Sequence, residues 1–360
     1  MRKILLLLFC LVIPDMICAD DDFGYTKKPN VMSTSSEPVL SFGGIFDVGA
    51  LGNAVYSVPI EVPQGVGGME PQISINYDSN GAYGLVGRSF NIGGLSCITR
   101  GNRTDFYDGK NSPLSFCEDD AYFLDGQRLI LESGDDGMPN AKYSLANDPY
   151  TKAFIRGSYL KGSNVTHWEV HAKDGSITEY DAPVNYNSGS ELRIYAWYIT
   201  KVTDKLGNYM TYTYQLSGFT LYPFVISYGE NVNSKSGLRN SVEFSYEPCP
   251  ASMGFAFDNK RGYISNRLLT ITTKTNGKVF RKYAFNYNNV VHCKAPISCL
   301  TSITMYNGKD EHVKPIRFEW NDAEFEMNVS NPLVENSSMP YFIKSKNHNF
   351  MCADLNGDGI

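Results

Sequence analysis

The sequence has few charged residues for its length, and after its first twenty residues it has no long apolar run. Only 19% of its 360 residues are charged and the formal net charge is −6, so nothing favours an electrostatic interface with nucleic acid. A membrane-spanning helix needs about 20 consecutive apolar residues. We therefore expect no nucleic-acid partner and no stable membrane span.

Helix signals and catalytic motifs are also missing. No segment of about a dozen residues combines an apolar period of 3.6 with helix caps. The sequence has no G-x-S-x-G elbow, no CxxC and no His at zinc spacing from a Cys. The Gly-rich stretch 65–69 lacks the Lys-Ser/Thr of a phosphate loop and reads as backbone kinks between strands. We expect no catalytic residues and no enzyme activity.

The first residues resemble an export signal. Arg2 and Lys3 precede the apolar run 4–13, and a small residue for cleavage follows at Ala19. Ten apolar residues are too few to cross a bilayer. Lipidation at Cys18 is the alternative, which we disfavour because the residues before it are not small. The sequence predicts a secreted, extracellular protein.

Six of the eight cysteines lie after the predicted export signal. An even number of cysteines in an exported chain is compatible with disulfides. Cys293 and Cys299 bracket a short loop that contains Pro296, so this is the pair we favour. Sequence alone leaves the connectivity open.

What the sequence does have is aromatic residues and turns. It contains 24 Tyr, 20 Phe and 32 Gly, and segments such as "AVYSVPIEV" and "QISINYDS" alternate apolar and polar residues as half-buried strands do. Asn-Gly and Asp-Gly pairs between such segments predict tight hairpin turns, namely Asp125-Gly126, Asp174-Gly175, Asn276-Gly277 and Asn307-Gly308, with a related turn at Gly207. These patterns predict an all-β fold of consecutive antiparallel hairpins, forming a large β-sandwich or barrel-like domain.

The second half of the chain contains an irregular repeat. We describe it as strand, a turn of the form x-x-D/N-x-G-x, then a strand ending in Tyr, and assign four segments to it: "KDGSITEYD", "DKLGNYMTYTY", "TNGKVFRKYAFNY" and "YNGKDEHVKPIRFEW". We interpret the aromatic residue as packing over its cross-strand neighbour. The period is not fixed, which argues against a solenoid.

An ordered set of motifs carries a family resemblance. It comprises Ser57-Val58-Pro59-Ile60, Pro63 with Gly65–Gly68, Pro71, Tyr77-Asp78-Ser79 and the run Gly93–Arg100. The chain resembles the SpvB/TcaC-type N-terminal domain of insecticidal toxin complex B components and of the Salmonella virulence plasmid 65 kDa B protein, over roughly residues 41–320. Segment 196–214 is similar to Rhs/YD repeats. The resemblance implies a structural role, with other toxin-complex or Rhs components as protein partners.

The last eight residues, "ADLNGDGI", resemble the start of an FG-GAP/VCBS-like β-propeller blade. Asp354, Asn356 and Asp358 stand at alternate positions before Gly359, as in the first half of a calcium loop. A calcium ion needs about six to eight oxygen ligands, and this loop is incomplete. We expect calcium as a cofactor of the full-length protein, and weak or no binding by the 360-residue chain.

One further group could hold a metal. His167, Glu169 and His171 in "HWEVH" would project from one face of a strand. Ligands spaced along a flat strand converge poorly, so we interpret them as a solvated face opposite a core that includes Trp168 and Val170.

The resulting domain organisation is a signal peptide over 1–19, a flexible polar leader over 20–40, an SpvB-like β domain over 41–322, and a linker with a truncated blade over 323–360. We expect a secreted, non-enzymatic structural domain that helps to build a shell or propeller scaffold around a toxin or effector. The alternative is an extracellular, adhesin-like module that binds carbohydrate or a host protein. An exported enzyme is the third and least supported hypothesis.

Overall fold

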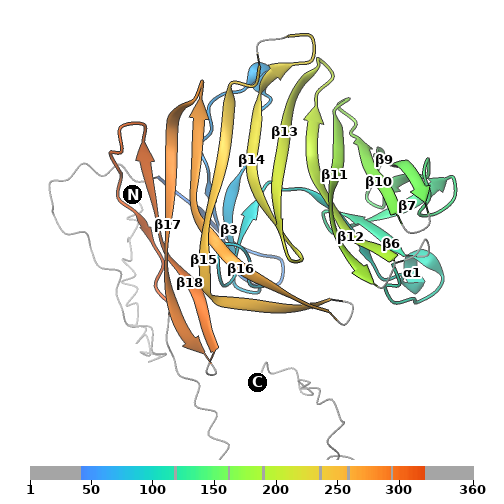
Figure 1. Ribbon diagram of the computed structural model, residues 1–360, viewed down its shortest axis with the longest axis horizontal. Coiled ribbons are helices and arrows are strands. Elements are labelled where there is room, and N and C mark those ends of the chain that lie inside the picture. Colours follow the sequence, from blue (N-terminus) through green and yellow to red (C-terminus); the bar gives the residue numbers. More distant parts are fainter. Residues whose placement is uncertain are drawn as a thin grey trace, which may run out of the picture. The chain divides into compact units, whose positions relative to one another are not determined.

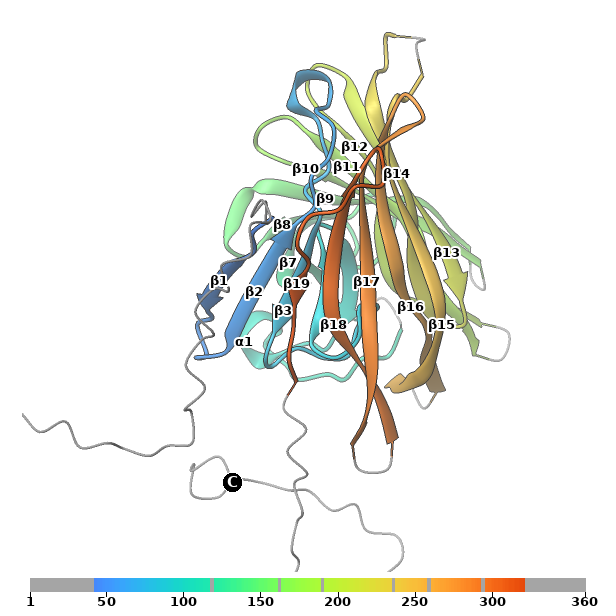
Figure 2. The same ribbon diagram turned by 90° about the vertical axis from the view of Figure 1, so that its left-hand side faces the viewer.

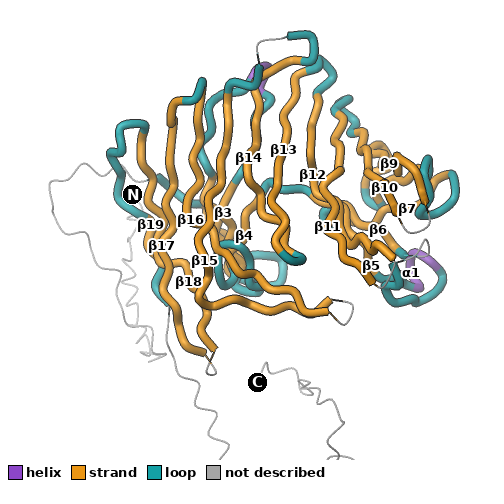
Figure 3. Tube along the Cα trace, viewed as in Figure 1, coloured by secondary structure: helices purple, strands orange, loops and turns teal. Residues whose placement is uncertain are grey.

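The structure is a computed structural model that describes residues 42–320, except for 117–119, 161–162, 189–190, 235–236, 258–259 and 293–294. This part of the chain is built from antiparallel strands (Figures 1 and 3), which confirms the predicted all-β class. Its helical segments are the short turns η1 (Val66–Gly68) and α1 (Asp105–Asp108). The expected propeller blade lies outside the described residues.

A small four-stranded sheet comes first. Its strands pair in chain order, and they are β1 (Ile45–Val48), β2 (Ala54–Pro59), β3 (Ser74–Asp78) and β4 (Phe90–Gly93). The alternation in the sequence places Val58 and Ile75, both fully buried, on the covered face of this sheet. Among the described strands, β1 pairs only with β2 and is an edge strand.

The next eight strands close into a ring. They are β5 (Cys97–Gly101), β6 (Ala121–Leu124), β7 (Gln127–Ser133), β8 (Lys142–Leu145), β9 (Asp148–Leu160), β10 (Ser163–His171), β11 (Ile177–Ser188) and β12 (Glu191–Thr203). Each strand pairs with its successor, and β12 returns to β5 through Ala196↔Thr99 and Tyr198↔Cys97. The ring therefore has no open edge.

Seven further strands extend the same sheet outward from β12. They are β13 (Asn208–Ser217), β14 (Thr220–Asn231), β15 (Asn240–Phe257), β16 (Lys260–Thr275), β17 (Lys278–His292), β18 (Ala295–Asn307) and β19 (Ile316–Arg317). β12 joins the ring to the extended sheet, because its residues 196–198 pair with β5 of the ring and its residues 201–203 pair with β13 of the extended sheet.

The predicted turns are present, but only some of them have the two-residue form. Asp125-Gly126 and Asn276-Gly277 both place two successive residues at positive φ, as a type I′ turn requires. At Gly175 and Gly207 only the glycine has positive φ, because the connections there are longer. At Asn307-Gly308 the positive φ falls on Asp310 instead, so that turn differs from the predicted one.

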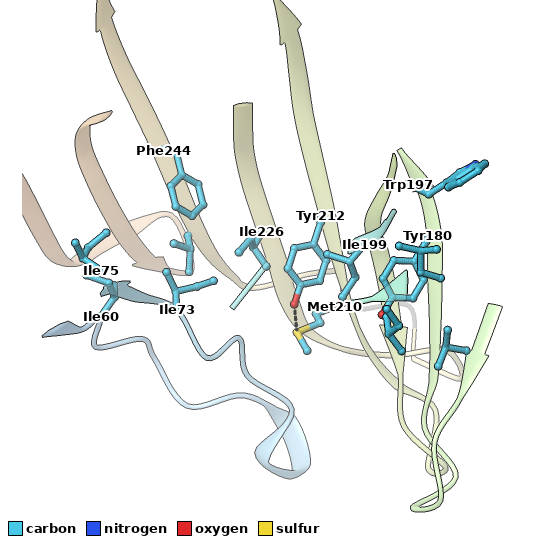
Figure 4. Packing of buried hydrophobic residues seen from close by; sticks show 14 of the residues in the cluster. Ile60, Ile73, Ile75, Tyr180, Trp197, Ile199, Met210, Tyr212, Ile226 and Phe244 are labelled. Carbon is cyan, nitrogen blue, oxygen red and sulfur yellow. Dashed lines mark hydrogen bonds between the residues drawn. The ribbon is translucent and has the colours of Figure 1, made fainter. Parts of the chain in front are cut away.

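The small sheet packs on the extended sheet (Figures 2 and 4). Ile60, Ile73 and Ile75 belong to the same buried cluster as Ile226 and Phe244 of the large sheet. Burial of such side chains contributes about 1.5–3 kcal/mol each. This packing covers one face of the extended sheet.

Long-range hydrogen bonds fix the position of the small sheet. The Glu61 amide donates to the Tyr283 hydroxyl at 2.9 Å, and the Tyr228 hydroxyl donates to the Pro63 carbonyl at 2.7 Å. Both tyrosines are fully buried. Buried polar groups need such partners, so these bonds select one docking position for the segment after β2.

The interior of the ring is filled by aromatic side chains. Trp168 lies against Tyr122, Tyr143 and Trp197, with ring centroids 4.9, 5.3 and 6.0 Å apart. All four side chains are at most 1% exposed. Edge-to-face and tilted contacts at these distances are favourable for aromatic rings. The ring is thus a packed core, and Trp168 and Val170 are buried as predicted.

An aromatic ladder joins successive hairpins of the large sheet. In each case an aromatic side chain donates a hydrogen bond to a backbone carbonyl of the previous hairpin. The tyrosine hydroxyls bond as Tyr214 to Ile199 (2.8 Å), Tyr246 to Pro223 (2.7 Å) and Tyr287 to Leu268 (2.6 Å), and Trp320 Nε1 donates to Leu300 (2.7 Å). Each acceptor lies directly opposite the preceding aromatic residue, in the pairs Tyr180↔Ile199, Tyr214↔Pro223, Tyr246↔Leu268 and Tyr287↔Leu300.

The acceptors of this ladder stand at register shifts. A residue of the second strand is skipped in each hairpin, as between Thr213↔Val225 and Tyr214↔Pro223. Such bulges leave backbone groups without a ladder partner, and the aromatic residue of the next hairpin supplies one. The last aromatic residues of the four segments of the sequence repeat are Tyr180, Tyr214, Tyr287 and Trp320, which are positions of this ladder. The structure shows that the aromatic residue at the end of a copy forms a hydrogen bond as well as a ring contact.

Candidate binding surfaces

Several candidate residues lie outside the described part of the chain. The predicted calcium ligands Asp354, Asn356 and Asp358 are among them, and so is Cys293. Cys299 is described and is 1% exposed on β18, where it pairs with Asn288. Among the residues that the structure describes, no group of three His, Cys, Asp or Glu side chains could hold a metal ion. The calcium loop and the Cys293–Cys299 pair stay predictions.

The "HWEVH" residues occupy β10 as expected, with His167, Glu169 and His171 on the face opposite Trp168. Glu169 accepts a hydrogen bond from Arg156 Nε at 2.9 Å and contacts His171 Nε2. Burial alone would raise the pKa of Glu169, but the bonds from His171 and Arg156 hold it below its usual value. The carboxylate is occupied by Arg156 and His171, which favours a polar strand face over a metal site.

The Gly-rich loop is a structural connection. Its carbonyls at Pro63 and Gln64 accept hydrogen bonds from Tyr228 and from Asn240 Nδ2, the latter at 3.0 Å. Gly67 has a φ of 63°, a conformation that glycine adopts without steric cost. The loop faces the large sheet and is held there by these two carbonyl oxygens.

An inter-sheet cavity of about 510 Å³ lies where the ring, the small sheet and the extended sheet meet. Its lining includes Leu95, Cys97 and Tyr198 from the ring side and Phe219 and Leu221 from the extended sheet. No Lys, Arg, Asp or Glu is present among its described lining residues. The cavity is therefore suited to neutral, apolar groups.

The titratable groups of this cavity are neutral near pH 7. Burial, with a contribution from Asp125, raises the pKa of Cys97 to about 11. Burial and the neighbouring Cys97 raise the pKa of Tyr198 to about 12, and they raise that of Tyr195 as well. A thiol with a raised pKa is a poor nucleophile, so the cavity offers no activated group for covalent chemistry.

A second concavity, the aromatic groove, lies between the small sheet and the last strand of the large one. It has a volume of about 410 Å³ and is lined by Phe46, Tyr56, Tyr77, Phe90 and residues 316–320. Phe90 forms its centre, with ring centroids 5.0 Å from Tyr77 and 4.9 Å from Phe318. Clustered aromatic rings of this kind are typical of protein interfaces.

An ion cluster joins α1 to β7 and to the connections around residues 103 and 136. Asp108 accepts from Arg103 at 3.0 Å and from Arg128 at 2.6 Å, and Arg103 also bonds Asp136. Burial alone would raise the pKa of Asp108, but the Thr104 amide and Arg128 lower it. The charges compensate one another, so the cluster holds the loop around α1 in place.

Neither the cavity nor the ion cluster was found from sequence. The cavity combines residues from distant strands, and the ion cluster combines residues of α1, β7 and two connections; the members of both are ordinary in type. Thr99 and Leu221, which both line the cavity, are more than a hundred residues apart in the chain. The repeat was the one available signal of the groove, because its final copy ends on Trp320.

These features define a class: an all-β domain in which a closed ring of hairpins continues into an extended, partly covered sheet. Residues 48–220 match the family model for SpvB, the Salmonella virulence plasmid 65kDa B protein. Over that segment the chain is similar to this family, which confirms the resemblance seen in the sequence. No curated protein matches the chain in sequence.

Solved structures with this fold include toxin complexes. The crystal structure of TcdB2-TccC3 aligns with a TM-score of 0.62 at 12% identity, covering 80% of this chain and 17% of that one. The Photorhabdus luminescens Tc holotoxin pore aligns at 0.61 and 13%, covering 81% and 17%. The N-terminal domain of the effector SpvB from Salmonella typhimurium strain LT2 aligns at 0.54 and 12%, covering 73% and 99%.

The low identity and the short coverage limit these structural similarities to the fold. At 12–13% identity they show the fold alone, and the chain spans about 17% of the toxin-complex chains. Within residues 42–320, leaving aside the undescribed gaps, no helix has the length and apolar character to cross a membrane.

Proposed function

We propose that this chain is a secreted, non-enzymatic structural domain of a toxin-complex B-like or Rhs-like protein. It helps to build the scaffold that encloses or docks a toxin or effector polypeptide, and its partners are other components of that assembly. The observation that carries this proposal is the fold, which covers 80% of this chain in the alignment with TcdB2-TccC3.

The physical character of the domain supports the proposal. The ring is filled by interlocked aromatic side chains, and the ladder ties each hairpin to the previous one. Such a sheet resists deformation, as a wall element must. Among the described residues that line the inter-sheet cavity none is Lys, Arg, Asp or Glu, and its thiol has a raised pKa, which favours architecture over catalysis.

The test uses the full-length protein that carries this chain, co-expressed with the polypeptide encoded beside it. We expect the two to co-purify and part of the partner to be protected from protease. Tyr283→Phe removes the hydroxyl that holds the Glu61 amide and should hasten cleavage of the protected part. Tyr263→Phe, at an exposed ring, is the matched control.

A different outcome would overturn the proposal. If the full-length protein protects no polypeptide and instead binds defined glycans on an array, the extracellular binding module is the better description. Equal cleavage rates in Tyr283→Phe and Tyr263→Phe, together with normal co-purification, would place this domain outside the wall.

A further inference from the structure

Trp320, the last described residue of the aromatic ladder, differs from the three tyrosines in the strands beside it. Tyr214, Tyr246 and Tyr287 each bond the previous hairpin on one side and pair with a return strand on the other. Trp320 makes the same bond, with its Nε1 donating to the Leu300 carbonyl at 2.7 Å. It lies three residues after the end of β19, and among the described strands β19 pairs only with β18. The repeating pattern therefore calls for a strand beyond β19.

The surface beside β19 is prepared for such a strand. The aromatic groove runs along residues 316–320, and its opposite wall is formed by Phe46 of β1 and Tyr56 of β2. Ile45, Phe46 and Val48 are 68%, 66% and 60% exposed. An exposed apolar edge strand is a template for further pairing, and folded proteins usually cover it.

The floor of the groove is already fixed. Trp320 lies edge-on to Tyr77 and Phe90, with centroids 6.2 and 6.3 Å away, and Arg88 lies 5.9 Å over its ring. Phe318 is held between Phe90 and Tyr56, at 4.9 and 6.0 Å. A preorganised surface loses little entropy when an occupant binds.

The sequence directly after Trp320 has the properties of the missing occupant. Asn321-Asp322 are turn-forming residue types, and two residues are enough to reverse a strand. Ala323, Phe325, Met327 and Val329 then alternate with Glu324, Glu326 and Asn328, which is the period of a strand with one apolar face. Arg317 and Glu319 both line the groove, so their charges balance and the apolar face of the segment is what matches the groove.

We propose that residues 323–329 bind in the aromatic groove as the return strand of β19, with Phe325 and Met327 against the aromatic floor. This strand would cover the free edge of the large sheet and shield Phe46. The inference concerns this chain's own packing and does not depend on the proposed function.

Tryptophan fluorescence tests the proposal in the full 360-residue chain. The chain has three tryptophans, and Trp168 and Trp197 are fully buried in the ring, so acrylamide quenching reports mainly on Trp320. We expect Phe325→Ser and Met327→Ser to raise the quenching constant and shift the emission to longer wavelength. Trp320→Phe should abolish the response.

The matched controls are Glu324→Ser and Glu326→Ser, which alter the opposite face of the same segment and should leave quenching unchanged. A direct readout is a disulfide between Phe46→Cys and Phe325→Cys, formed under mild oxidation and identified by peptide mass spectrometry. The pairing of Phe46→Cys with Glu324→Cys should form it much less.

Three results would overturn the proposal. The first is equal quenching in Phe325→Ser, Glu324→Ser and the unmodified chain. The second is quenching that changes with protein concentration alongside dimers in sedimentation, which would assign the groove to a second copy. The third is quenching that falls only when a partner protein is added.

Discussion

The aromatic ladder makes a quantitative prediction at Tyr287. Its hydroxyl donates to the Leu268 carbonyl at 2.6 Å, and Leu268 is fully buried. Tyr287→Phe keeps the ring, including its stacking against Arg267 at 4.5 Å, but leaves the carbonyl without that donor. Removing one partner of a buried hydrogen bond costs about 1–3 kcal/mol, so we expect the free energy of unfolding to fall by that amount.

The assay is urea unfolding followed by circular dichroism, with Tyr263→Phe as the control because Tyr263 is 49% exposed. The midpoint should move to lower urea while the slope stays constant, since the surface exposed on unfolding is unchanged. The reasoning is refuted if Tyr287→Phe is as stable as Tyr263→Phe.

The same side chain gives a pH signature. Burial is the main cause that raises the pKa of Tyr287 well above its ordinary value of 10. A group whose folded pKa is raised stabilises the folded state fully below the unfolded pKa and loses that contribution as the pH rises above it. The stability difference between the natural chain and Tyr287→Phe should therefore shrink at alkaline pH above 10.

Three further predictions follow from the ring, from a surface ion pair and from the end of the chain. Trp168→Ala removes the centre of the ring core and should cost about 3–5 kcal/mol in urea unfolding; a loss within the error of a surface variant would contradict the packing. Hydrogen bonds from Lys152 and Lys142 lower the pKa of Glu132 to about 2, so its contribution is present above the ordinary value of 4.5 and lost as the pH falls toward 2; Glu132→Gln should be less stable than the natural chain near neutral pH and equal to it at that acid end. Calorimetry should detect weak or no calcium binding by this chain and clear binding by a longer one; tight binding here that Asp358→Ala abolishes would contradict the incomplete loop.

Much of the fold could be predicted because it is written in local signals. Alternating segments such as 54–62 gave the strands, and Asp125-Gly126 and Asn276-Gly277 gave turns whose φ values are positive as required. Closure of the ring could not be predicted, because it depends on Ala196 pairing with Thr99. No local pattern shows which distant strand will occupy an edge.

The aromatic ladder contains both features that could be predicted from the sequence and features that could not. Sequence revealed aromatic residues at the ends of strands, but missed Tyr246, because no Asn-Gly or Asp-Gly turn precedes it. What selects these positions is a bulge on the neighbouring strand, whose carbonyl would otherwise lack a partner. A bulge is a property of two paired strands, so one strand's sequence cannot encode it.

With the bulges known, an aromatic hydrogen-bond donor indicates where a hairpin begins. An aromatic donor that bonds the carbonyl opposite the previous aromatic residue marks the first strand of a hairpin, and this holds for Tyr214, Tyr246 and Tyr287. Trp320 satisfies the same condition with an indole N–H in place of a phenol. The substitution is chemically equivalent, because both groups donate one hydrogen bond from the rim of a partly buried ring. The sheet is therefore prepared to add another hairpin at β19.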